Sequence, residues 1–213
     1  MVPARFVFEY SQRSLAILER LEPEARRQDL LTSFALLAAS PLLLIPFERS
    51  RPGHPLFSAA DDGKRAVAMR SLDRLPFIGN PFCPASAAAR WRFSHIIQHH
   101  NDPHRWSDHD GRHPMDPGAV NSITSQNAAK VLRVLRNALA HGNIVYLNGD
   151  GREVAGTRVE YLAFLSRYEE SPERREAAET YRLVVTTEGE FLRFLKAWAS
   201  WLSGLPAEDR IAA

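Results

Sequence analysis

The chain has 213 residues, of which 45% are hydrophobic, and its formal net charge is +2. This length and composition are typical of a globular protein that buries its own core, so we expect a single domain over residues 1–213. The small net charge excludes a protein that is basic throughout, and any anion site must therefore be a local concentration of charge.

Cysteine usage and the start of the chain favour a cytoplasmic location. The single cysteine, Cys83, excludes an internal disulfide and a zinc site with several cysteine ligands, which fits a reducing compartment. Residues 1–14 lack the continuous apolar core of a signal peptide. We therefore expect a cytoplasmic protein.

The first part of the chain is predicted to be helical. Residues 11–22 carry leucines at helical spacing, and Pro23 suits the first turn of a second helix. The apolar stretch 30–47 is long enough to cross a membrane, but Pro41 and Pro46 interrupt it and charged sequence flanks it closely. We expect a buried core helix that breaks near Pro41, and no membrane partner.

The middle of the chain alternates between turn-rich and periodic segments. Residues 49–62 are predicted to be a loop, 63–75 a helix, and 76–84 a stretch of turns, because proline and glycine are frequent there. A further helix is predicted over residues 86–100. A polar loop over residues 101–118 then leads into the next helix.

The sequence pattern changes in the last third of the chain. β-branched and aromatic residues predict short strands at 144–147 and 181–186, with a turn at 148–151. Residues 159–168 are predicted to be a short helix, and residues 169–179 look solvated and charged. The elements together predict a mainly α fold, a helical bundle with a small β-hairpin or two short strands.

The final helix is well delimited by the sequence. Thr187 and Glu190 form a capping box at its start, and Gly204 and Pro206 end it. Its apolar stripe consists of Phe191, Phe194, Leu195, Trp198, Trp201 and Leu202. Because these side chains repeat at helical spacing, we interpret them as core or dimer contacts and not as a platform for stacking bases.

A helix predicted over residues 127–141 separates an apolar face from a basic face. Five polar side chains fall within an arc of about 140° on a helical wheel, with no large apolar residue among them. This basic arc consists of Lys130, Arg133, Arg136, Asn137 and His141. Gly142 can end the helix in the left-handed conformation, which places His141 in its last turn. A solvated helix face has the same pattern, so the arc alone does not establish a site.

A second group of candidate residues is a histidine cluster. It comprises His95, His99, His100, His104, His109 and His113, interleaved with aspartates. His95 and His99 have the spacing of two zinc ligands on a helix, but Ile96 stands where zinc proteases place their glutamate. We therefore predict no metal site. A polar loop that lines an RNA cleft, or one without specific function, is the favoured interpretation.

The basic helix carries a resemblance to a known family. The run Arg136-Asn137-Ala138-Leu139-Ala140-His141 resembles the R-polar-x3-H signature of the HEPN superfamily of nucleotide-binding and RNA-cleaving helical domains. The match over the whole of residues 135–143 is more specific than the match to this short motif. Two further segments, 44–49 and 191–198, are similar to a plasmid-associated HEPN subgroup. The fold implied is thus a HEPN-like helical bundle.

The resemblance implies a metal-independent endoribonuclease that needs no cofactor. In HEPN ribonucleases two protomers pack their motif helices about a two-fold axis, so that both arginine–histidine pairs line one cleft. Here the arc between Arg136 and His141 is too wide for one helix to close around a phosphate, and a partner helix would complete the pocket. The implied partners are RNA and a second copy of the chain.

The implied reaction is attack of a ribose 2′-hydroxyl on the adjacent phosphate, which leaves a 2′,3′-cyclic phosphate. His141 would transfer protons, and Arg136 would stabilise the charge that develops on the phosphorane. Asn137 would orient the phosphate or His141. Lys130 and Arg133 would bind flanking phosphates.

One departure from the family limits what the resemblance implies about control. HEPN toxins that are silenced by nucleotidylation carry a tyrosine two residues after the histidine, where this chain has Asn143. A role as a toxin or defence effector is compatible with the motif, but the sequence identifies no antitoxin or other regulatory partner. The alternative function is a non-catalytic HEPN module that binds a nucleotide or RNA as a sensor or scaffold.

Overall fold

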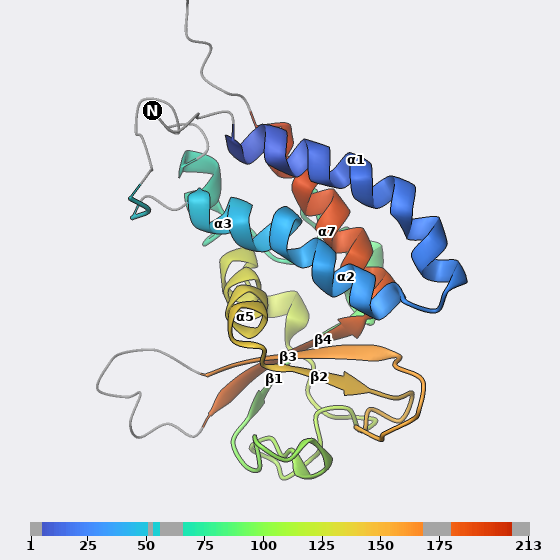
Figure 1. The fold of residues 1–213 in the computed structure, drawn as a ribbon. Helices are drawn as coiled ribbons and strands as arrows, with labels where there is room; N and C mark the ends of the chain where they lie inside the picture. Colours follow the sequence, from blue (N-terminus) through green and yellow to red (C-terminus); the bar gives the residue numbers. More distant parts are fainter. Residues whose placement is uncertain (1–5, 51–52, 56–65, 168–179, 206–213) are drawn as a thin grey trace, which may run out of the picture.

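A layer of helices packs on one face of a four-stranded antiparallel sheet (Figure 1). This computed structural model describes residues 6–50, 53–55, 66–167 and 180–205. The protein is a mixed α/β domain, and the expectation of a mainly α bundle with two strands is therefore wrong in part. The charged stretch predicted at 169–179 lies outside the described residues, as do most of the loop predicted at 49–62 and the start of the helix predicted at 63–75.

The helices are α1 (Phe6–Arg27), α2 (Leu31–Ala39), α3 (Ile45–Arg49), α5 (Ala128–His141) and α7 (Glu188–Ser203), with a π-helical turn at Ser40–Leu44 between α2 and α3. Residues 66–71 are also helical, and 3-10 turns occupy Ala85–Arg90, Pro103–Arg105 and Ile123–Ser125. The strands are β1 (Trp91–Ile96), β2 (Ile144–Leu147), β3 (Tyr161–Arg167) and β4 (Tyr181–Thr187).

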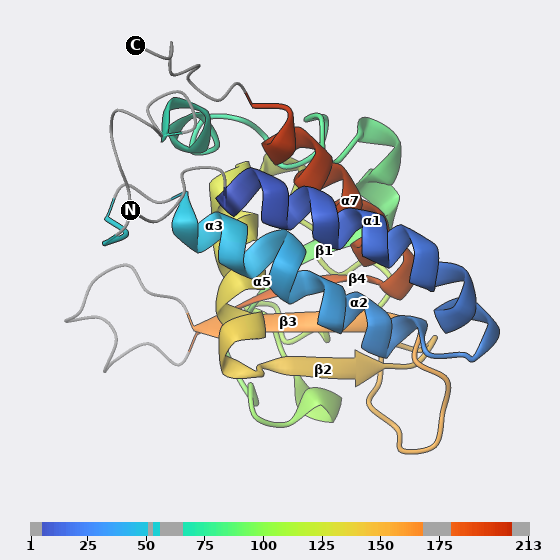
Figure 2. The same cartoon turned by 45° about the horizontal axis from the view of Figure 1, so that its top comes forward.

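Two prolines lie inside helices that the sequence predicted to stop at them. Pro23 is within α1 and does not begin a new helix. At Pro41 the chain continues from α2 into α3 without a break, because the turn widens to a π-helix (Figure 2). Proline has no N–H to donate, and its ring crowds the preceding turn. A π-turn is one way in which a helix accommodates a proline.

The helix from Leu31 to Arg49 lies in the helical layer and is partly buried. Its length and hydropathy are sufficient to cross a membrane, a property that core helices of soluble proteins share. Its buried side chains, which include Phe34, Leu42 and Leu43, belong to the same core cluster as α7. The buried face of this segment thus belongs to the core as predicted, whereas the predicted break near Pro41 is absent.

The sheet has the strand order β1-β4-β3-β2, and all of its neighbours are antiparallel. The strands predicted at 144–147 and 181–186 are confirmed. The helices predicted at 86–100 and 159–168 are wrong, because these segments contain β1 and β3. Both strands are short and buried along most of their length, and a short buried run lacks the alternation that separates a strand from a helix.

Each face of the sheet is covered by a different apolar cluster. Alternate side chains, such as Phe93, Phe164 and Val184, pack beneath the helices. The opposite face carries Leu165 and Leu183 with Trp106, from the loop after β1. Because successive side chains of a strand lie on opposite faces of the sheet, they pack into two separate apolar clusters.

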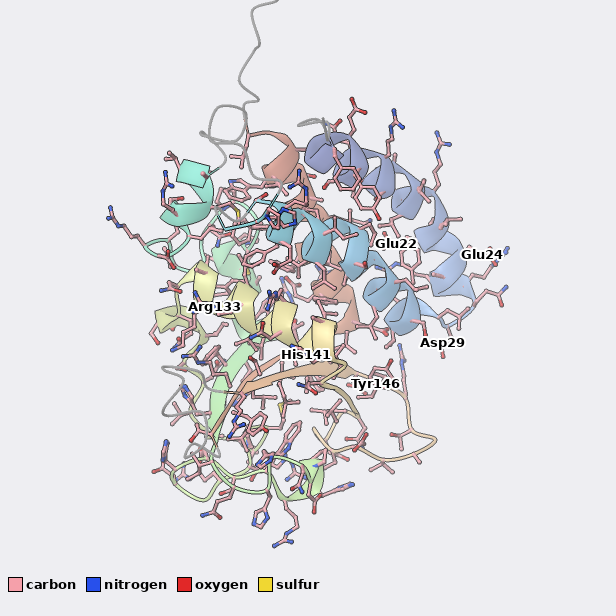
Figure 3. All side chains as sticks on the ribbon, turned by 60° about the vertical axis from the view of Figure 1, so that its left-hand side comes forward. Glu22, Glu24, Asp29, Arg133, His141 and Tyr146 are labelled. Carbon is pink, nitrogen blue, oxygen red and sulfur yellow. The ribbon has the colours of Figure 1, made fainter. Side chains whose placement is uncertain are left out.

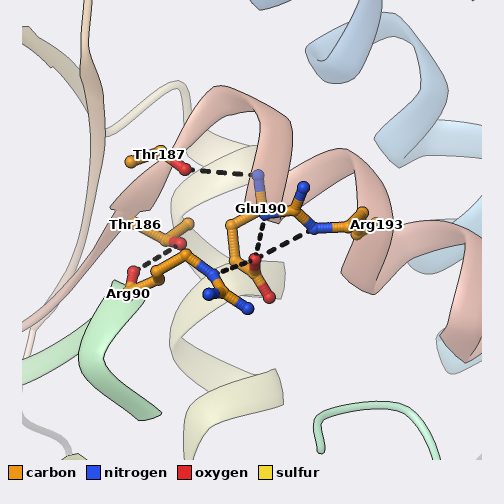
Figure 4. A network of polar contacts seen from close by, with 5 residues as sticks. All are labelled: Arg90, Thr186, Thr187, Glu190 and Arg193. Carbon is orange, nitrogen blue, oxygen red and sulfur yellow. Dashed lines mark hydrogen bonds and ion pairs between the residues drawn. The ribbon is translucent and has the colours of Figure 1, made fainter. Parts of the chain in front are cut away.

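Helix α7 is joined to the sheet by its first turn (Figure 4). Thr187 Oγ1 accepts a hydrogen bond from the Glu190 backbone N–H at 3.3 Å. This bond is one half of the predicted capping box. The Glu190 carboxylate instead bonds Arg90 Nε at 2.6 Å and Arg193. Burial alone would raise the pKa of Glu190, but these two arginines lower it below its ordinary value.

The apolar stripe of α7 forms core contacts. Trp198 is fully buried, and its ring lies 6.4 Å from that of Phe47 in α3. The interpretation of these aromatic side chains as core and not as a stacking platform is therefore confirmed. This packing fixes α3, which carries part of the candidate site.

Candidate functional site

Helix α5 forms where the sequence predicted it and with the predicted ends. The Asn127 side chain accepts a hydrogen bond from the Lys130 backbone N–H at 2.8 Å, which caps the first turn. Gly142 has a φ of 71°, and its N–H bonds the Ala138 carbonyl, so it ends the helix in the left-handed conformation. His141 is accordingly the last residue of α5.

The motif arginine is held by two neighbours. Arg136 Nε donates to Glu48 Oε1 of α3 at 2.5 Å, and Arg136 Nη1 donates to Asn137 Oδ1 at 2.6 Å. The side chain is 25% exposed and that of Glu48 is 34% exposed. Among the described residues the Nη2 amino group has no hydrogen-bond partner. The guanidinium is thus held at Nε and Nη1 and keeps Nη2 as a donor for a ligand.

Asn137 connects this ion pair to the sheet. Its Nδ2 donates to Ser166 Oγ of β3 at 3.0 Å, and Ser166 is buried. Glu48, Arg136, Asn137 and Ser166 therefore form a polar relay that crosses from α3 through α5 to β3. The amide of Asn137 uses its oxygen toward Arg136 and one N–H toward Ser166, and among the described residues no hydrogen bond joins it to His141.

The relay borders a groove of about 530 Å³ between α3 and α5. The groove is lined by Ser40, Leu44, Ile45, Glu48, Arg49, His54, Arg136, Ala140 and His141. The π-turn and α3 supply one wall, and the last turn of α5 supplies the other. One chain therefore brings Arg136 and His141 to a shared groove, whereas the resemblance implies that a partner helix completes the pocket.

His141 is the most accessible of the chemically active groups in the groove. Its side chain is exposed at the end of α5, where Figure 3 labels it. It makes no hydrogen bond or ion pair with any residue in 6–50, 53–55, 66–167 or 180–205. An imidazole that is not engaged by neighbours can exchange protons with a ligand.

The other two cations of the basic arc lie outside this groove. Lys130 Nζ lies 5.2 Å from the centre of the Phe93 ring, over β1. Arg133 is exposed and borders a smaller hollow of about 150 Å³ with Arg70 and Asp73. Figure 3 shows Arg133 and His141 well separated along α5. The side chains of the basic arc thus lie in three different places: the groove, the Phe93 ring and the smaller hollow.

The histidine cluster does not form a helical site. His95 lies in β1 and His99 follows it with a φ of 54°, so the two do not share a helix face. The described residues contain no group of three or more histidine, cysteine or acidic side chains placed to hold a metal ion. Trp106 packs the loop on the side of the sheet opposite the helices (Figure 1), so this loop does not line the groove.

The sequence assigned no role to Glu48, Arg49 and His54 of the groove or to Ser166 of the relay. Glu48 and Arg49 belong to the segment 44–49, which carried part of the resemblance. The resemblance therefore marked a segment that borders the groove. No sequence signal identified His54 or Ser166.

Comparisons with protein-family models, with curated proteins and with solved structures gave no match.

His113, in the loop below the sheet, predicts a pH dependence of stability. Its Nε2 bonds the Pro103 carbonyl at 3.0 Å, and its Nδ1 accepts from the Met115 N–H at 3.2 Å. Burial lowers the pKa of His113, the Pro103 hydrogen bond opposes this, and the charge of Arg152 adds to the lowering. The neutral ring therefore belongs to the folded state, whereas the unfolded chain takes up a proton near pH 6.5.

We predict that the free energy of unfolding decreases as the pH falls below about 6.5, and that His113→Gln makes this decrease smaller. Urea unfolding at pH 7.5 and 5.5 measures the difference. His109→Gln, at an exposed position of the same loop, should behave as the wild type. An equal decrease in wild type and His113→Gln would contradict the prediction.

Proposed function

We propose that the protein is a metal-independent endoribonuclease whose site is the groove between α3 and α5. The observation that carries this proposal is that Arg136, fixed by Glu48 and Asn137, lines the same groove as the unengaged His141. The resemblance of residues 136–141 to the HEPN signature supports it. A fixed guanidinium beside an accessible imidazole suits charge stabilisation and proton transfer at a phosphate.

The charges of the groove suit a single phosphodiester. Arg49 and Arg136 are positive and Glu48 is negative, which leaves a net charge of one positive on the ionised groups that line it. In the proposed reaction the 2′-hydroxyl loses its proton and attacks phosphorus, the bond to the 5′ oxygen breaks, and this oxygen takes up a proton to leave as a 5′-hydroxyl, so that a 2′,3′-cyclic phosphate remains. His141 takes part in proton transfer, and Arg136 Nη2 donates to a non-bridging oxygen.

A homodimer remains part of the proposal. The end of α5 is exposed at His141, so a second copy can bring its own groove alongside the first. In this arrangement the two grooves extend one RNA-binding surface, and each keeps its own arginine and histidine. This differs from a site shared between protomers.

The ion pair of Arg136 with Glu48 favours a second function. Its Nε is already bound to Glu48, so an anion that needs both edges of the guanidinium has to displace a carboxylate. This arrangement suits a non-catalytic module that binds a nucleotide or RNA as a sensor or scaffold. Whether purified protein cleaves RNA separates the two functions.

We predict that Arg136→Ala and His141→Ala each lower RNA cleavage by at least about a hundredfold, as is usual for the loss of charge stabilisation or of a proton-transfer group. Cleavage should persist in EDTA, because the nucleophile is internal to the RNA. Gel assays and mass spectrometry of the product ends measure both effects, with melting temperature as the folding control.

Two results would contradict the enzymatic proposal. Loss of cleavage in EDTA with rescue by zinc would show metal-dependent chemistry. Wild-type protein that binds several single-stranded RNAs but cuts none of them would favour the binding module.

We predict that Arg133→Ala reduces the slope of log binding constant against log salt concentration by about 0.7, the value for one phosphate contact on a single strand. Lys130→Ala should change the slope less, because Lys130 Nζ already lies over the Phe93 ring. Fluorescence titration between about 50 and 200 mM salt measures the slopes. An unchanged slope for Arg133→Ala would exclude this residue from the RNA-binding surface.

We predict that mixing inactive Arg136→Ala and His141→Ala proteins does not restore cleavage, because each groove takes both residues from one chain. Light scattering first establishes the oligomeric state of each variant, and denaturation and refolding of the mixture ensures subunit exchange. If the site were shared between protomers, random pairing would restore about a quarter of wild-type activity. Such recovery would contradict a groove contained in one chain.

A further inference from the structure

The smaller hollow that Arg133 borders lies beside the groove. Its volume is about 150 Å³, and three parts of the chain form its walls: α3, the first turns of α5, and the segment that runs from the helical residues 66–71 into the turn after them. The hollow is lined by Phe47, Met69, Arg70, Leu72, Asp73, Ala129 and Arg133. Apolar and charged side chains thus meet in one surface depression.

The apolar part of the hollow is continuous with the core. Met69 and Leu72 are buried, and Phe47 and Ala129 are partly buried and pack against the same cluster. An apolar cavity of about this volume accommodates one benzene-sized ring. The hollow therefore offers one base ring a surface on which it is shielded from water.

Two arginines border this apolar surface without internal partners. Arg70 and Arg133 are exposed, and neither side chain makes a hydrogen bond or ion pair within the part of the chain that the structure describes. With Asp73, the ionised side chains that line the hollow carry a net charge of one positive. Basic side chains beside a surface for a base ring match the two halves of a nucleotide, its phosphate and its base.

The hollow continues the proposed site along both of its walls. Phe47 of the hollow is followed in α3 by Glu48, which lines the groove. In α5, Arg133 of the hollow precedes Arg136 of the groove by three residues. Residues at this spacing are neighbours on a helix surface, with Cβ atoms about 5–6 Å apart. One RNA strand that follows α5 can therefore contact both arginines.

We infer that the smaller hollow binds the base of a nucleotide that flanks the phosphate at Arg136, with Arg70 and Arg133 bound to the phosphates on either side of that base. The inference rests on the proposed function, because it extends the RNA from the groove. The volume matches the single ring of a pyrimidine. Since a paired base cannot enter the hollow, the substrate is single-stranded at this position.

The test separates the base from the phosphates by means of two probes of equal length and charge. One is a 12-nucleotide oligouridylate in which every 2′-hydroxyl is methylated, so that it cannot be cleaved. The other has the same backbone without bases. Fluorescence anisotropy measures both affinities, and we expect wild type to bind the oligouridylate at least about tenfold more tightly, the size typical of one bound base.

Ala129→Leu fills the hollow and leaves both arginines in place. It should weaken binding of the oligouridylate about tenfold and change binding of the base-free strand by less than about threefold, because only the base loses its place. Ala155→Leu adds the same side chain at an exposed loop position and should keep the wild-type ratio of the two affinities. A wild-type ratio in Ala129→Leu, with a melting temperature that shows it to be folded, would overturn the inference.

Arg70→Ala tests the phosphate contact and decides the inference if Ala129→Leu does not fold. For both probes it should reduce the slope of log binding constant against log salt concentration by about 0.7, the value for one phosphate on a single strand. Arg74→Ala removes an exposed arginine that does not line the hollow and should keep the slope. An unchanged slope for Arg70→Ala would overturn the inference.

A second copy of the chain is the other occupant that the experiment can detect. If light scattering shows that Ala129→Leu changes the oligomeric state while the ratio of the two affinities stays at its wild-type value, the hollow is a contact between copies. That result would also overturn the inference.

Failure of the inference is distinguishable from failure of the proposed function. If wild type binds the oligouridylate but cleaves no unmodified RNA, the enzymatic proposal fails, and a lower affinity ratio in Ala129→Leu still supports a base in the hollow. If wild type cleaves RNA and Ala129→Leu keeps the wild-type ratio, the inference fails and the proposed function stands. Absence of oligouridylate binding by the wild type would overturn both.

Discussion

The ion pair between Arg136 and Glu48 is the interaction on which the candidate site depends. A guanidinium that is three-quarters buried needs partners, and Glu48 and Asn137 satisfy two of its edges at 2.5 and 2.6 Å. The same contacts join α3 to α5, and Ser166 extends the link to the sheet. The packing of Phe47 against Trp198 fixes α3 from behind. Three parts of the chain that are distant in sequence therefore determine where the motif arginine lies.

The ion pair also has a consequence for function. Because Glu48 is a third exposed, its contact with Arg136 is screened by water and stabilises the fold only modestly. A phosphate can thus compete for the guanidinium at a small cost in stability, while Asn137 continues to hold the other edge. The groove combines a preorganised arginine and an unengaged His141 in one chain. This arrangement makes catalysis within a single protomer chemically reasonable.

The sequence predicted local features well and distant contacts poorly. The bounds of α5 followed from its periodicity and from Gly142, which are local signals, and the Asn127 cap became evident only in the structure. The strands β1 and β3 were read as helices because short buried runs carry little periodicity, and Pro41 was read as a break because the π-turn that accommodates it has no sequence signature. The site residues Arg136 and His141 came from the motif. Their partner Glu48 lies 88 residues away, and only the tertiary packing shows that contact.

The most direct test of this account is a crystal structure of the protein with a short RNA. The 2′-hydroxyls of this RNA are replaced by hydrogen, so that the RNA cannot be cleaved. The account predicts a phosphate in the groove between α3 and α5, with one of its oxygens about 3 Å from Arg136 Nη2, a normal hydrogen-bond distance, and with His141 beside the ribose. A nucleic acid bound on another surface, such as the loop side of the sheet, with Arg136 still paired only with Glu48 and Asn137, would contradict it.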